Sequence, residues 1–120
     1  MKEILNEANV GKIISGLRRG EKADSIGWVR VGDTYEKGSN GTSKIIVTEM
    51  PFTGIRVQYF AMLGNPCTVS FVIDTFGQIL SIDDYSRQMN EYHAMSIKEL
   101  VQWIAVLALS LGSDQDYGND

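Results

Sequence analysis

The stretch from Leu100 to Leu111 restricts the fold of this chain most, because all of its side chains except Gln102 and Ser110 are apolar. With about 100° between successive side chains, a helix over these residues is apolar around nearly its whole circumference. Such a helix has to be enclosed on several sides. It is also shorter than the ~20 residues that span a bilayer, so we interpret it as a buried helix and not as a membrane anchor.

The residues before this stretch predict where the helix begins. Ser96 is a preferred N-cap residue, and Glu99 stands three positions later, which is the spacing of a capping box. Met95 is placed to pack on Leu100 as a hydrophobic staple. We predict that the helix ends at Gly112, because glycine is favoured just after the last apolar residue of a helix.

Two partners compete to cover the side of this helix that faces away from the sheet. One is the N-terminal helix of the same chain, and the other is a second copy of the chain packed about a two-fold axis. We favour the second copy, because monomers rarely leave large apolar patches exposed. The predicted homodimer interface consists of Trp103, Ile104, Leu107 and Leu111.

The N-terminal part of the chain predicts an amphipathic helix. Val10, Ile13, Ile14 and Leu17 form one apolar stripe, and two arginines then precede Gly20, which is typical of a helix end. Glycines inside this segment suggest a close approach to another part of the chain.

The middle of the chain predicts an antiparallel sheet of about five strands in a meander. Alternating or β-branched residues place the strands at 26–31, 44–49, 55–63, 67–73 and 78–82. The last two strands are joined by a hairpin at 74–77 with a glycine that needs positive φ. We expect a mobile loop over 32–43, since it holds three glycines and Tyr35 as its one apolar residue. A loop of this kind either carries function or has none.

Together these elements predict an α+β fold, with the sheet flanked by an N-terminal helix and a largely apolar C-terminal helix. A chain of 120 residues is large enough for one hydrophobic core. We therefore expect a single domain over 1–112, followed by a polar, acidic tail over 113–120.

Composition narrows the function classes. The net charge of −4, with basic residues scattered along the chain, argues against nucleic-acid binding. The single cysteine and the single histidine exclude an internal disulfide and a Cys/His zinc site. The first nine residues lack an apolar run, so we expect a cytoplasmic protein. We expect neither a metal nor a cofactor.

Two pairs of a cation and an aromatic residue are candidate ligand-binding residues. Trp28 and Arg30 share a face of the first predicted strand, and Arg56 shares a face of the third with Gln58 and Phe60. A guanidinium beside an aromatic ring suits a nucleotide, with the base stacked and the phosphate paired. The alternative is that the aromatic residues belong to the core and the arginines form ion pairs.

His93 is the candidate for acid/base chemistry, because it lies near Asp83, Asp84, Tyr85, Glu91 and Tyr92 in the sequence. The alternative is a polar loop that precedes a capped helix. No serine or cysteine stands in a nucleophile motif, so catalysis has little support.

The sequence thus favours a non-enzymatic, homodimeric binding protein that acts on a protein partner. Inhibitors, regulators and chaperones, including phage or mobile-element proteins that block host defences, are often small and acidic in this way. The first alternative is a binder that holds a nucleotide or cyclic nucleotide at a dimer interface with Trp28, Arg30 and Arg56. The second is an acid/base enzyme that uses His93.

Overall fold

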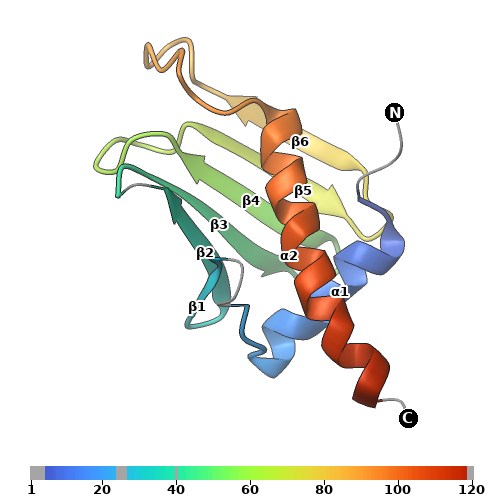
Figure 1. Ribbon diagram of the computed structural model, residues 1–120. Coiled ribbons are helices and arrows are strands. Elements are labelled where there is room, and N and C mark those ends of the chain that lie inside the picture. Colours follow the sequence, from blue (N-terminus) through green and yellow to red (C-terminus); the bar gives the residue numbers. More distant parts are fainter. Residues whose placement is uncertain (1–4, 24–26, 40, 119–120) are drawn as a thin grey trace.

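A computed structural model describes residues 5–23, 27–39 and 41–118, and for 39 and 112–118 the backbone alone. It contains a helix, six strands and a second helix, in that order (Figure 1). Their bounds are α1 (Glu7–Arg19), β1 (Val29–Val31), β2 (Thr34–Ser39), β3 (Ser43–Met50), β4 (Gly54–Phe60), β5 (Val69–Asp74), β6 (Ile79–Asp84) and α2 (Ile97–Gly118). The predicted α+β class is confirmed, with six strands in place of about five.

All six strands form one antiparallel sheet in the order β1-β2-β3-β4-β5-β6, so the predicted meander is confirmed. Every strand pairs with its sequence neighbour. At the β5–β6 hairpin, Gly77 has the expected positive φ of 94°, and the Asp74 carboxylate accepts the N–H groups of Phe76 and Gln78, each at 2.9 Å.

Both helices cover the same face of the sheet, which we call the inner face. In Figure 1, α2 crosses the front of the sheet and α1 lies beside the C-terminal half of α2. The inner-face side chains of the strands join those of the helices in one core. Its largest fully buried side chains include Trp28, Tyr35, Phe71, Ile13 and Ile104.

Local signals in the sequence position α1 correctly. Its N-cap is Asn6, which accepts the N–H of Asn9 at 2.9 Å, and its C-cap is Gly20 in the left-handed conformation (φ 70°). Gly16 lies where α1 passes closest to its neighbours, because a Cβ there would lie 2.8 Å from the Tyr35 hydroxyl and 2.9 Å from the Leu111 side chain. Gly11, in contrast, faces open space.

The capping box at α2 is confirmed. Glu99 Oε1 accepts the backbone N–H of Ser96 at 2.9 Å, and Ser96 Oγ accepts the N–H of Glu99 at 3.2 Å. The prediction that the helix ends at Gly112 is wrong, since the helical backbone continues to Gly118. Glycine permits a left-handed cap but does not impose one, and no proline follows to stop the helix.

The prediction of a mobile loop over 32–43 is also wrong, because β2 occupies residues 34–39. Tyr35 is fully buried and pairs with Val47, so one apolar residue suffices to fix this strand on the sheet. The first strand is shorter than predicted: it covers Val29–Val31, and residue 26 lies outside the described part of the chain.

Candidate functional site

The structure brings Arg56, Gln58 and Phe60 together on the face of the sheet opposite the helices, which we call the outer face. They lie on β4, one of the two central strands, with their side chains on one side of the strand. Arg56 is exposed, and Gln58 and Phe60 are half-buried. This part of the predicted ligand site is therefore a continuous surface.

Trp28 and Arg30 are separated from that surface. Trp28 is fully buried in the core. Arg30 lies in the row of Tyr35, Val47 and Val57, which is the inner face. The five predicted ligand-binding residues therefore do not form one site, and the arginines lie on opposite faces.

Arg30 has a structural role at the end of α1. Its guanidinium donates to the Gly16 carbonyl at 3.1 Å and to the Gly32 carbonyl at 2.7 Å, and it lies 5.6 Å from the centroid of the Tyr35 ring. A cation at the C-terminal end of a helix is stabilised by the helix dipole and satisfies a terminal carbonyl. Its donors are thus directed at backbone oxygens and not at a ligand.

No helix covers the outer face in the described part of the chain. We call residues that are direct cross-strand neighbours a row. The row that contains Arg56 consists, from β1 to β6, of Val31, Thr34, Thr48, Arg56, Val72 and Leu80. Val31 and Leu80 are 47% and 41% exposed, and Val29 in the neighbouring row is 53% exposed. Exposed apolar side chains therefore stand at both edges of this face, and the strands between them carry polar groups together with Ile46 and Val72.

The outer face carries charges of both signs, and the exposed Asp83 of β6 stands on it opposite Ser70. Lys44 is paired with Glu36, with Nζ 3.1 Å from Oε1. Among the described residues, no carboxylate forms a salt bridge with Arg56. Arg56 is thus an exposed cation in the middle of the sheet, in a chain whose net charge is −4.

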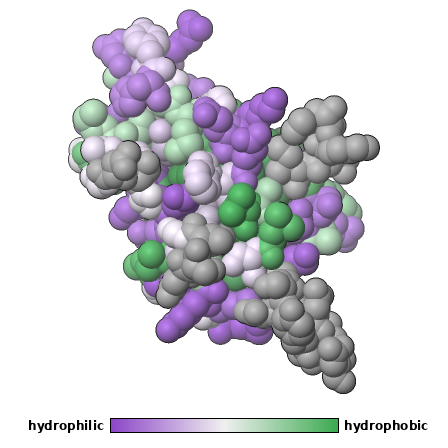
Figure 2. Space-filling model, viewed as in Figure 1, coloured by the Kyte–Doolittle hydropathy of each residue, from purple (hydrophilic) through white to green (hydrophobic). Residues whose placement is uncertain are grey.

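The predicted dimer interface on α2 is divided in the same way. Ile104, Leu107 and Leu111 are fully buried in the core of the single chain, so they offer no surface to a second copy. Trp103 is 37% exposed and belongs to an exposed apolar stripe with Val106 and Leu109. Figure 2 shows hydrophobic residues gathered over α2.

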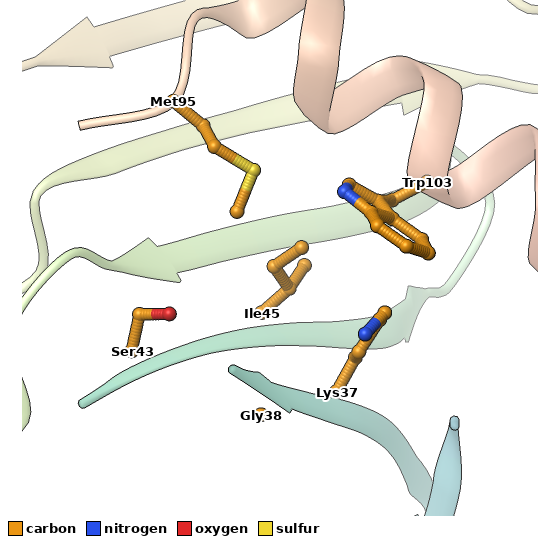
Figure 3. A pocket seen from close by; sticks show the side chains of 6 residues that line it. All are labelled: Lys37, Gly38, Ser43, Ile45, Met95 and Trp103. Carbon is orange, nitrogen blue, oxygen red and sulfur yellow. The ribbon is translucent and has the colours of Figure 1, made fainter. Parts of the chain in front are cut away.

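Trp103 also closes a small cavity between α2 and the sheet (Figure 3). Lys37 extends from β2 to place Nζ 4.2 Å from the centroid of the Trp103 ring, a cation–π contact. Met95, Ile45 and Ser43 line the rest of the cavity, whose volume is ≈30 Å³. That is room for about one water molecule, so this is a packing defect and not a ligand site.

The residues around His93 do not form an acid/base cluster. His93, Tyr85 and Tyr92 are all exposed in the loop between β6 and α2. None of the described residues forms a hydrogen bond with the His93 ring. Glu91 is buried and accepts from Thr68 Oγ1 at 2.8 Å and from Asn65 Nδ2 at 3.1 Å. Its carboxylate therefore fixes the loop to the sheet and does not orient the histidine.

Asp84 also stabilises the loop after β6. Its carboxylate accepts the Ser86 N–H at 3.0 Å and the Ser86 hydroxyl at 2.7 Å. These hydrogen bonds to the charged form lower the pKa of Asp84. A lowered pKa keeps the carboxylate ionised and makes it a poor general acid near neutral pH.

An open pocket of ≈380 Å³ lies at the C-terminal end of α1, with charged groups of both signs in its walls. Arg18 makes a bidentate ion pair with Glu49, with contacts of 2.5 and 3.1 Å. This pair lowers the pKa of Glu49 and raises the pKa of Arg18. Arg30 and Asp33 add one charge of each sign, so the pocket has no net charge to select an ion.

The only cysteine, Cys67, is half-buried, and burial raises the pKa of its thiol. A thiol with a raised pKa is a weak nucleophile at neutral pH. Within the described ranges, no three His, Cys, Asp or Glu side chains are grouped closely enough to hold a metal ion. In the same ranges, neither helix has the length and apolar character needed to cross a bilayer.

Sequence reasoning missed the outer face as a whole, because which strands share a face depends on their register. Val29, Val31 and Leu80 were not singled out, although their exposure on a sheet face is the feature that distinguishes this surface. Comparisons with protein-family models, with curated proteins and with solved structures found no match to the chain.

Proposed function

We propose that this chain is a non-enzymatic binding protein that holds a protein partner on the outer face of its sheet. One observation carries the proposal: both helices lie on the inner face, and the opposite face exposes apolar side chains around a central arginine. Such a protein acts as an inhibitor, a regulator or a chaperone of its partner.

The size of the outer face supports this proposal. Six strands with a mean length of six residues, at ~4.8 Å spacing and ~3.4 Å per residue, give a face of roughly 600 Å². A standard protein interface buries about 800 Å² on each partner, so the sheet face supplies most of one. Apolar residues mixed with a few polar groups are also typical of non-obligate interfaces.

The test is an affinity purification from the cells that make the protein, followed by calorimetry with the purified partner. We expect the double substitution Val31→Glu and Leu80→Glu to weaken binding about 100-fold or more, because it places charges at both apolar edges. Tyr92→Glu is the matched control, since Tyr92 is exposed on the loop before α2. Equal affinity of the double variant and the control would contradict the proposal.

We further propose that the chain forms a homodimer through the exposed stripe of α2, Trp103, Val106 and Leu109. Leu109 is 64% exposed, and the stripe contains no charged side chain. A stripe of this kind is self-complementary about a two-fold axis. Light scattering should report a dimer for the wild type and for Tyr92→Glu, and a monomer for Leu109→Glu; a monomeric wild type at high concentration would refute this interface.

A further inference from the structure

The structure points to the chemistry of the partner: we infer that it is a protein segment that presents an aspartate or glutamate to Arg56, with apolar side chains on either side. This inference rests on the proposed binding function of the outer face. It adds the charge and the centre of the contact, which that proposal leaves open.

The first step of the argument is the position of Arg56. It stands on β4 between Thr48 of β3 and Val72 of β5, its direct cross-strand neighbours. It is exposed and has no salt-bridge partner among the described residues. An arginine at this place is left unpaired when a partner displaces water, unless the partner supplies an acceptor.

The second step is what surrounds the guanidinium. The side chains of Thr48, Gln58 and Ser70 lie on the same face of β3, β4 and β5, within a row or two of Arg56. Hydroxyl, amide and guanidinium groups all donate hydrogen bonds. A carboxylate is the small group that accepts several such bonds and pairs bidentately with arginine.

The third step excludes a second copy of the chain from this face. Two sheets that pack face to face lie ~10 Å apart. When a two-fold axis passes through the centre of this face, the central strands of the two copies lie opposite each other. Arg56 is on β4, one of the two central strands. Two like charges would therefore meet in a desolvated interface, which is unfavourable.

The fourth step concerns nucleic acid. A phosphate backbone is bound by several cations, each neutralising a phosphate. On the outer face, Lys44 is already paired with Glu36, which leaves Arg56 as the cation without a salt bridge among the described residues of this face. One cation in a chain of net charge −4 suits a single carboxylate and not a polyanion.

The experiment uses random twelve-residue peptides displayed on phage and selected on the full chain. We expect the selected peptides to share an Asp or Glu flanked by apolar residues. Synthetic versions are then compared with isosteres in which Asp becomes Asn and Glu becomes Gln. The isosteres should bind about 10- to 100-fold more weakly, which is the range for loss of a charge-assisted hydrogen bond.

Variants of the chain complete the test. Arg56→Gln should lose the same factor and bind peptide and isostere equally, Arg56→Lys should keep part of the preference, and Arg87→Gln, on the exposed loop after β6, should change nothing. Backbone amide NMR spectra of each variant report both its folding and the contact surface. Peptide-induced shifts should map to β3, β4 and β5.

The outcomes separate the two proposals. Peptides whose shifts map away from the outer face would refute the proposed function. Peptides that bind the outer face without a preference for the carboxylate would leave the function standing and overturn this inference. Binding of single-stranded oligonucleotides that depends on Arg56, or concentration-dependent shifts on the outer face without peptide, would also overturn it.

Discussion

Gly16 and Gly11 form a matched pair that tests how closely α1 approaches α2 and the sheet. Both lie inside α1, so an alanine at either position gains the same intrinsic helix propensity, about 0.5–1 kcal/mol. A methyl group at Gly11 meets nothing within 4 Å, whereas one at Gly16 would lie 2.8 Å from Tyr35 Oη and 2.9 Å from Leu111 Cδ1. Only the second substitution therefore forces neighbouring atoms to move.

Neither neighbour of Gly16 moves easily. The Tyr35 hydroxyl donates to the Glu21 carbonyl at 2.5 Å, which fixes the end of a rigid ring. Leu111 is fully buried, so its methyl groups have no open space to enter. Adding a methylene to a well-packed core costs about 1–3 kcal/mol, and the propensity gain offsets only part of that cost.

The expected results follow from these magnitudes. Gly11→Ala should raise the free energy of unfolding by about 0.5–1 kcal/mol. The free energy of unfolding of Gly16→Ala should be about 1–3 kcal/mol lower than that of Gly11→Ala. Urea denaturation followed by circular dichroism measures both, and the difference between the variants cancels the propensity gain. If Gly16→Ala were as stable as Gly11→Ala, the close approach of α1 to Tyr35 and Leu111 would be refuted.

Three further predictions concern local hydrogen bonds and titration. Ser96→Ala removes the N-cap of α2 and should lower the free energy of unfolding by about 1 kcal/mol, measured by thermal melting; no change would show that the cap contributes nothing. Asp84 has a lowered pKa in the folded state, so the stability it contributes is present above the ordinary aspartate pKa and is lost as the pH falls through the lowered value. Asp84→Asn should therefore lose less stability than the wild type on acidification below about pH 4. An equal loss in the free energy of unfolding of the two proteins would contradict the lowered pKa of Asp84. Because burial raises the pKa of Cys67, its thiol should react with a disulfide reagent at pH 8 much more slowly in the folded chain than in urea, and equal rates would contradict the burial.

The elements that the sequence predicts correctly are those with signals inside a few residues. The N-cap Ser96 and Glu99 locate the start of α2, and Gly20 locates the end of α1. The β5–β6 hairpin follows from the alternation of apolar residues and from a turn that needs Gly77. In each case the physical cause is local, so no knowledge of the rest of the chain is required.

The sequence did not predict β2, because its apolar alternation is weak and its formation depends on pairing with β1 and β3. Tyr35 is its one large apolar side chain, and Lys37 adds only an aliphatic stem that ends over the Trp103 ring. A two-residue connection, Gly32 and Asp33, stands between β1 and β2, and Gly32 has a positive φ of 59°. Glycine followed by aspartate between two strands indicates a hairpin, and this signal could have revealed the sixth strand.

The sequence predicts the part of the candidate site that lies on one strand and not the relation between different strands. Alternation within one strand assigns Arg56, Gln58 and Phe60 to a common face. It does not relate Arg30 to Arg56, because that relation depends on the register of three strand pairs between them. A shift of one residue in any of these pairings would exchange the faces, so long-range pairing and not composition separates the two arginines.

The two proposed surfaces have a joint consequence for how the protein would act. The exposed stripe belongs to α2, which lies on the inner face of the sheet, and the outer face is the opposite side of the same two-layer molecule (Figure 1). A dimer formed through α2 would therefore leave both outer faces accessible, each with its own Arg56. Two linked sites bind a partner with repeated acidic segments far more tightly than one, since the second contact becomes intramolecular. On this argument, Leu109→Glu lowers the apparent affinity for such a divalent partner and leaves the affinity for a single acidic peptide unchanged, whereas Arg56→Gln lowers both.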